Sequence, residues 1–93
     1  MIVIEHIALD CNKISQSIKL KGVLAVLGIH VSNNSNPEMA VIINTSQDIS
    51  RVIDIVLLTE GQDASVLLNK LTFKGNDKGY YLFEKEIRPK PRV

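Results

Sequence analysis

The hydrophobic positions of the 93-residue chain fall into short runs separated by polar and glycine-containing segments. Residues 39–44 form a β-branched run bounded by polar residues, and this pattern predicts a buried strand. Residues 2–9 have the composition of a strand, although Ile4, Ile7 and Ala8 also fit one face of a helix. Residues 65–73 and 80–87 flank a glycine- and asparagine-containing turn at 74–79, which predicts an antiparallel hairpin.

The clearest helical pattern lies at residues 47–59. Apolar residues recur there with the spacing of one helical face, at Ile49, Val52, Ile53, Val56 and Leu57. Thr45 and Ser46 offer an N-cap in front of this pattern, and Gly61 follows its end. We therefore predict a helix at residues 47–59.

Residues 12–31 admit two interpretations, and the fold depends on them. In one, a helix runs from Asn12 to His30 and contains two glycines, each costing about 1 kcal/mol relative to alanine. In the other, the helix ends at Lys21 with Gly22 as its cap, and residues 23–31 form a strand. Both give an α+β two-layer sandwich: the first in the order β-α-β-α-β-β, the second in the ferredoxin-like order β-α-β-β-α-β with an additional C-terminal strand.

Length and composition fit one small domain. The chain is 45% hydrophobic and 23% charged, with a formal net charge of +1, and chains of this size seldom hold two cores. We expect a single domain at residues 1–88, followed by an extended basic tail at 89–93, where Pro89 and Pro91 oppose a helix. Because the chain lacks a long apolar run and starts without a secretory signal pattern, we expect a cytoplasmic protein that does not cross a membrane.

The charges are unevenly distributed along the chain. Residues 1–69 hold four basic and seven acidic side chains, a net charge of −3, whereas residues 70–93 hold seven basic and three acidic ones, a net charge of +4. Basic segments attract polyanions, because each neutralised phosphate releases a condensed counterion. The same lysines are equally typical of a solvated hairpin protected against edge pairing.

A family resemblance adds to this charge pattern. The apolar run at residues 23–27, the strand-like run at 40–43, the segment Ile49–Val56 and a basic hairpin ending at Arg88 together resemble the Alba family of small, dimeric nucleic-acid-binding proteins. The resemblance covers about three quarters of the chain and implies the β-α-β-α-β-β order. It also implies a homodimer in which two basic hairpins lie on one face.

The Alba pattern is incomplete in this chain. Where the family carries a basic, glycine-containing loop after the first strand, this chain has Leu9-Asp10-Cys11-Asn12-Lys13, so that only Lys13 is carried over as a phosphate contact. From the resemblance and the charge pattern together, the expected nucleic-acid-binding residues are Lys13, Arg51, Lys70, Lys74, Lys78, Arg88, Lys90 and Arg92.

Signals for catalysis, metal binding or cofactors are weak. His6 and His30 are far apart in the sequence and lack ligand spacing, and the glycines form no phosphate-binding motif. We expect His30 to be partly buried and Cys11 to be a small buried hydrophobic residue. Tyr81 and Phe83 alternate on the predicted hairpin and hence share one face, which we expect to belong to the core. We predict neither enzymatic activity nor a cofactor.

Three functions follow from these observations. The first is a non-enzymatic homodimer that binds the phosphate backbone of nucleic acid through the basic C-terminal hairpin and tail. The second is a ferredoxin-like regulatory or protein-interaction module, similar to ACT domains, in which the strand at residues 23–31 is apolar on both faces and must be covered by a partner. The third is a structural or inhibitory partner protein with a large apolar interface.

Overall fold

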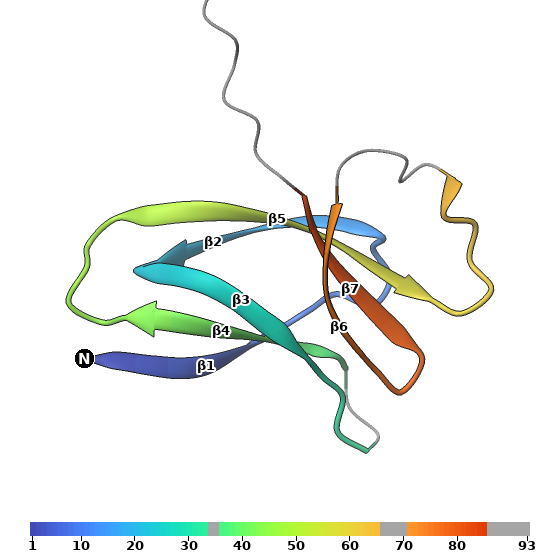
Figure 1. The fold of residues 1–93 in the computed structure, drawn as a ribbon, viewed down its shortest axis with the longest axis horizontal. Helices are drawn as coiled ribbons and strands as arrows, with labels where there is room; N and C mark the ends of the chain where they lie inside the picture. Colours follow the sequence, from blue (N-terminus) through green and yellow to red (C-terminus); the bar gives the residue numbers. More distant parts are fainter. Residues whose placement is uncertain (34–35, 66–70, 86–93) are drawn as a thin grey trace, which may run out of the picture.

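The computed structural model describes residues 1–33, 36–65 and 71–85, and within these ranges the chain forms strands without an α-helix (Figure 1). The strands are β1 (Ile2–Ala8), β2 (Ser15–Lys21), β3 (Val23–His30), β4 (Glu38–Asn44), β5 (Ser50–Thr59), β6 (Leu71–Asp77) and β7 (Tyr80–Lys85). They form two antiparallel sheets: a three-stranded sheet in the order β1-β4-β3 and a four-stranded sheet in the order β2-β5-β7-β6. The fold is a small β-sandwich.

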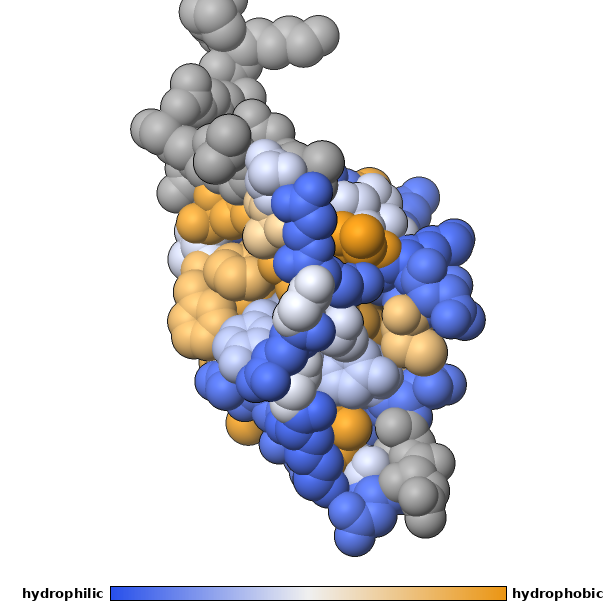
Figure 2. Space-filling model, turned by 90° about the vertical axis from the view of Figure 1, so that its right-hand side faces the viewer, coloured by the Kyte–Doolittle hydropathy of each residue, from blue (hydrophilic) through white to orange (hydrophobic). Residues whose placement is uncertain are grey.

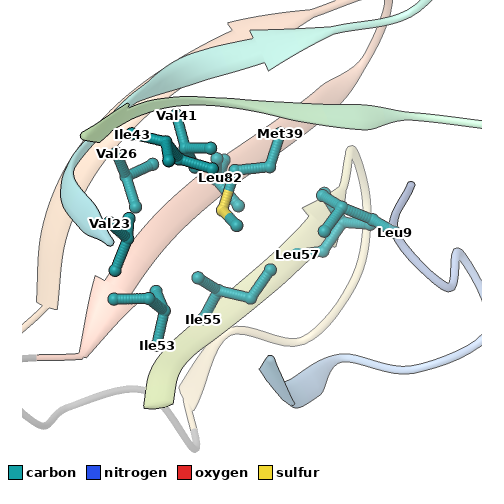
Figure 3. Packing of buried hydrophobic residues seen from close by; sticks show 10 residues of the cluster. All are labelled: Leu9, Val23, Val26, Met39, Val41, Ile43, Ile53, Ile55, Leu57 and Leu82. Carbon is teal, nitrogen blue, oxygen red and sulfur yellow. The ribbon is translucent and has the colours of Figure 1, made fainter. Parts of the chain in front are cut away.

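The hydrophobic core lies between the two sheets (Figure 3). From β4, Met39, Val41 and Ile43 alternate toward the interior, while Ile42 between them faces outward and is half-buried. The four-stranded sheet contributes mainly Ile53, Ile55 and Leu57 of β5 and Leu82 of β7. Burying a side chain of this size stabilises the fold by about 1.5–3 kcal/mol.

The chain passes from one sheet to the other through a single residue between β2 and β3. Gly22 has φ of +72° there, a left-handed conformation that favours glycine. Its N–H donates to the carbonyl oxygen of Ile49 at 2.9 Å, and its own carbonyl accepts from the N–H of Asn44 at 2.8 Å. Gly22 therefore ties the β2–β3 corner to the β4–β5 connection.

Two glycines let the sheets meet closely on the β3–β6 side. A Cβ atom on Gly75 would lie 3.6 Å from the Cα of Gly28, and one on Gly28 would lie 3.2 Å from the carbonyl oxygen of Lys74. Beside them, the Val31 N–H donates to Oδ2 of Asp77 at 2.7 Å. The edge of β6 thus lies against β3 and is not open to solvent along its length.

The observed architecture shows that both α+β plans are wrong, the Alba-like and the ferredoxin-like one. The predicted helix at residues 47–59 is strand β5, which lies in the middle of its sheet between β2 and β7. Ile55 and Leu57 face the core, and Val56 and Leu58 are buried on the opposite face. A strand buried on both faces is a continuous apolar run, and such a run also contains helical spacing.

The predicted first helix is wrong in both of its versions, because residues 15–21 form β2. A two-residue alternation was present in this segment: Gln16, Ile18 and Leu20 are half-buried, and the serines and lysines between them are exposed. The strand predicted at residues 39–44 is confirmed as β4, and the strand alternatives at residues 2–9 and 23–31 are the correct ones, as β1 and β3. The C-terminal hairpin is present, but its first arm is Leu71–Asp77 and its turn is residues 78–79, so that β6 occupies most of the turn predicted at 74–79. Residues 66–70 and 86–87 of the predicted arms lie outside the described residues. The predicted tail at residues 89–93 lies outside the described residues.

Candidate interaction surfaces

The outer face of the three-stranded sheet carries a row of apolar side chains. The strand register places Ile4 of β1 opposite Ile42 of β4, and Ile42 opposite Ala25 of β3. Ile4 is 65% exposed and Ile2, two residues before it on the same face, is 64% exposed. These side chains form an apolar row across all three strands. The row lies on the sheet face that points away from the core between the two sheets.

Two irregularities in β3 extend this row. The β3–β4 register shifts at Leu24 and again at Leu27, so that each of the two leucines is an extra, bulged residue of β3 without a partner residue in β4. Val23 and Val26 remain buried in the core, whereas Leu24 and Leu27 are 41% and 45% exposed. We call the exposed or half-buried apolar residues here the isoleucine–leucine face; its members are Ile2, Ile4, Leu24, Ala25, Leu27 and Ile42.

Two histidines lie at the other end of the same sheet face. His6 of β1 and His30 of β3 stack with ring centroids 5.7 Å apart, although β4 separates their strands. In the register, Ala40 of β4 lies opposite His6 and Gly28 of β3 lies opposite Ala40, so that only small residues stand in the row next to the rings. Nδ1 of His6 lies 3.8 Å from the Glu38 carboxylate. The two histidines are far apart in the sequence, so the sequence alone did not predict this pair. The register of β1, β4 and β3 brings the rings together.

The expectations for His30 and Cys11 need correction. The His30 side chain is 53% exposed, with Nδ1 3.9 Å from the Asp77 carboxylate. Cys11 is an exposed free thiol whose Sγ lies 3.6 Å from Oδ1 of Asn36, because the β1–β2 loop carries it outside the core. In the described ranges, no three His, Cys, Asp or Glu side chains are arranged to hold a metal ion.

The outer face of the four-stranded sheet is aromatic. Tyr81 and Phe83 share one face, as predicted, but the expectation that this face belongs to the core is wrong, because Leu82 between them points inward. Phe73 of β6 pairs with Phe83 in the register, and the two rings lie 5.5 Å apart in a tilted arrangement. Phe73 is 54% exposed. Val56 and Leu58, on the same sheet face, are buried beside these aromatics.

Hydrogen bonds to carboxylates shift the pKa values of Tyr81 and Asp63. The Tyr81 hydroxyl donates to Oε1 of Glu60 at 3.0 Å; this hydrogen bond and the negative charge of Glu60 raise the pKa of Tyr81 above its ordinary value. At Asp63, hydrogen bonds from Ser65, including its backbone N–H at 2.9 Å, lower the carboxyl pKa. Asp63 lies in the β5–β6 connection, and Tyr81 of β7 contacts Glu60 at the start of that connection. Figure 2 shows one side of the molecule, on which hydrophobic patches lie on either side of a hydrophilic band.

The described members of the predicted nucleic-acid-binding set lie on different parts of the sandwich. Lys13 is exposed in the β1–β2 loop and Arg51 near the start of β5. Lys74 is 3.6 Å from the Glu84 carboxylate, with both side chains 26% exposed, and Lys78 in the β6–β7 turn donates to Oδ1 of Asn33 at 2.7 Å. The remaining four, Lys70, Arg88, Lys90 and Arg92, lie outside the described residues.

The described part of the chain is slightly acidic. It contains seven of the eleven basic residues and nine of the ten acidic ones, a net charge of −2. Two of its lysines pair with carboxylates: Lys74 with Glu84 and Lys21 with Asp48, the latter at 3.0 Å. Of the four described candidate residues, Lys74 is thus paired with a carboxylate, and Lys13, Arg51 and Lys78 lie in the β1–β2 loop, near the start of β5 and in the β6–β7 turn.

No known family model, curated protein or solved structure matches the chain. No helix in the described ranges is long and apolar enough to cross a membrane.

Proposed function

We propose that the protein is a non-enzymatic protein-interaction module that docks another protein chain on the isoleucine–leucine face. The observation that carries the proposal is the exposure of Ile2 and Ile4 at 64% and 65%, in one row with Ile42 and Ala25. An apolar sheet face that covers no core is a typical protein-interaction surface. The homodimer expected from the sequence is one form of this proposal.

The surroundings of this face support the proposal. The isoleucine–leucine face contains no charged residue, and the polar side chains of His6, His30 and Glu38 lie at one end of the same sheet face. An apolar centre with a polar rim is the usual composition of a protein interface. The exposed, free thiol of Cys11 fits a reducing compartment, and we place the protein in the cytoplasm.

The test is position-specific photocrosslinking in the cells that make the protein. A photoreactive phenylalanine analogue at Leu27, on the isoleucine–leucine face, should give covalent protein adducts that weaken several-fold when Leu24→Ser is added. The same analogue at Lys19, an exposed residue on the outer face of the four-stranded sheet, is the matched control and should give none of these adducts. Equal adducts from both positions, or adducts insensitive to Leu24→Ser, would reject docking on this face.

A second candidate function, binding of single-stranded nucleic acid, is favoured by the half-exposed Phe73 beside Phe83. Base stacking on a sheet-borne aromatic ring contributes about 1–3 kcal/mol per base. Lys85 is exposed at the end of β7 and pairs with Leu71, which directly follows Lys70 in the sequence. The described lysines of the basic C-terminal quarter, Lys74, Lys78 and Lys85, thus lie in β6 and β7 or in the turn between them, the two strands that carry Phe73 and Phe83.

Fluorescence polarisation with single-stranded DNA, RNA and duplex DNA across a salt series tests this second candidate. Binding should weaken with a log–log slope of about −0.7 per phosphate contacted on a single strand. Phe73→Ala should weaken it about 5- to 150-fold, whereas Ile49→Ala, at an exposed apolar residue outside the aromatic pair, should leave it unchanged. No binding at low salt would reject nucleic acid as a ligand.

A further inference from the structure

The backbone of β1 is available for pairing along one side. Hydrogen bonds at both ends of the β1–β4 ladder show which residues of β1 bond to β4. Thr45 N–H donates to the Met1 carbonyl at 2.9 Å, and Leu9 N–H donates to the Pro37 carbonyl at 3.0 Å. Because paired residues alternate in an antiparallel ladder, the odd-numbered residues of β1 bond to β4. The N–H and C=O groups of Ile2, Ile4, His6 and Ala8 therefore point to the free edge.

The edges of the sandwich differ in how they are protected against strand pairing. β2 carries Lys19 and Lys21, both exposed, and charged edge residues oppose strand pairing. β6 and β3 lie against each other through Gly28 and Gly75. β1 carries one exposed carboxylate, Glu5, but no lysine, arginine or proline between Ile2 and Ala8, and among the described strands it pairs only with β4.

We infer that the β1 strands of two copies of this chain pair antiparallel, with Ile4 opposite Ile4 of the second copy, to form one continuous six-stranded sheet. This inference rests on the proposed function, because it joins the two isoleucine–leucine faces into one surface around the two-fold axis. A two-fold axis at Ile4 places Ile2 opposite His6 of the second copy, so that residues with free backbone groups occupy the hydrogen-bonded positions of the new ladder.

Charge selects this register over its neighbour. A two-fold axis at Glu5 would set the two Glu5 carboxylates directly opposite each other, and like charges in such a pair are destabilising. With the axis at Ile4, Glu5 lies opposite Val3 of the second copy, and the central pair consists of two isoleucines. A single strand pair buries little area compared with the roughly 1,200–2,000 Å² of a stable interface. We therefore expect a dimer that dissociates on dilution.

Sedimentation analysis over a concentration series tests the pairing. The mass should rise from the 10.3 kDa of one chain toward twice that value as the concentration rises. His6→Pro removes an edge N–H without removing a β1–β4 hydrogen bond, and it should weaken the dimer at least tenfold. His6→Ala keeps the N–H, and Ala8→Pro makes the same backbone change outside the paired stretch; both should dimerise as the wild type does.

Cysteine crosslinking in a Cys11→Ser background tests the register. Ile4→Cys should form a covalent dimer under mild oxidation, since paired Cα atoms about 5.5 Å apart are within disulfide range. Ile2→Cys is equally exposed, but it would lie about 13 Å from its counterpart and should crosslink far more slowly.

Three results overturn the inference: a monomeric wild type at millimolar concentration, a dimer unaffected by His6→Pro, or equal crosslinking from both cysteines. The experiments distinguish a failure of this inference from a failure of the proposed function. A monomer that still gives Leu24-dependent crosslinks from Leu27 retains the docking face and loses only the dimer. A dimer without such crosslinks retains β1 pairing and loses the docked partner.

Discussion

Replacing Gly22 by alanine should destabilise the fold more than an ordinary glycine substitution does. The residue has φ of +72°, and an added Cβ would overlap the carbonyl oxygen of Asn44 and lie 3.3 Å from its carbonyl carbon. The left-handed conformation costs alanine about 1–2 kcal/mol. Moving the Asn44 carbonyl also weakens the hydrogen bond that it accepts from the Gln47 N–H and, through the same residue, the one that the Asn44 N–H donates to the Gly22 carbonyl, at about 0.5–1.5 kcal/mol each. We therefore expect a loss of about 2–5 kcal/mol, a large part of the 5–15 kcal/mol typical of a domain.

Urea and thermal unfolding followed by circular dichroism measure this loss. Each kcal/mol should lower Tm by about 4–8 °C for a domain of this size. Gly61→Ala is the matched control, because Gly61 also has a positive φ, of +83°, but an added Cβ would meet nothing within 4 Å. That variant should lose only about 1–2 kcal/mol. If the two variants lose the same stability to within about 0.5 kcal/mol, the steric argument for the β2–β3 corner is wrong.

Three further predictions concern the core, the sandwich edge and one titration. Leu82→Ala, at a fully buried residue, should cost about 2–5 kcal/mol of unfolding free energy, and a loss below 1 kcal/mol in urea unfolding would contradict its central place in the core. Asp77→Ala should cost about 1–3 kcal/mol because it removes the acceptor of the Val31 N–H; Asp77→Asn keeps an acceptor, and an equal loss in both variants would argue against this hydrogen bond. Glu60→Gln should lower the pKa of Tyr81 toward its ordinary value in an ultraviolet titration. Because the folded-state pKa of Tyr81 is raised, its contribution to stability is present at neutral pH and is lost as the pH rises through that pKa; an unchanged titration in the variant would contradict the contact.

The C-terminal hairpin shows how far local pattern determined this protein. Residues 71–77 and 80–85 contain β-branched or aromatic residues and meet at a glycine-containing turn, so that each has its pairing partner close in the sequence. Residues 39–44 lack such a turn, but their β-branched composition favours a strand. The alternation along residues 15–21 was equally local, and it would have identified β2. By contrast, the sequence could not distinguish strand from helix at β5, because burial on both sheet faces removes the two-residue period that identifies a strand.

The candidate surfaces depended on tertiary structure to a greater degree. The sequence by itself determined which side chains are apolar, aromatic or charged, and which neighbours on one strand share a face, as Tyr81 and Phe83 do. Only the pairing of β1 with β4 and of β4 with β3 decided that Ile4, Ile42 and Ala25 form one row and that His6 meets His30. The physical reason is that register is set by contacts between segments far apart in the chain, where the core selects one alignment among several that local propensity allows equally.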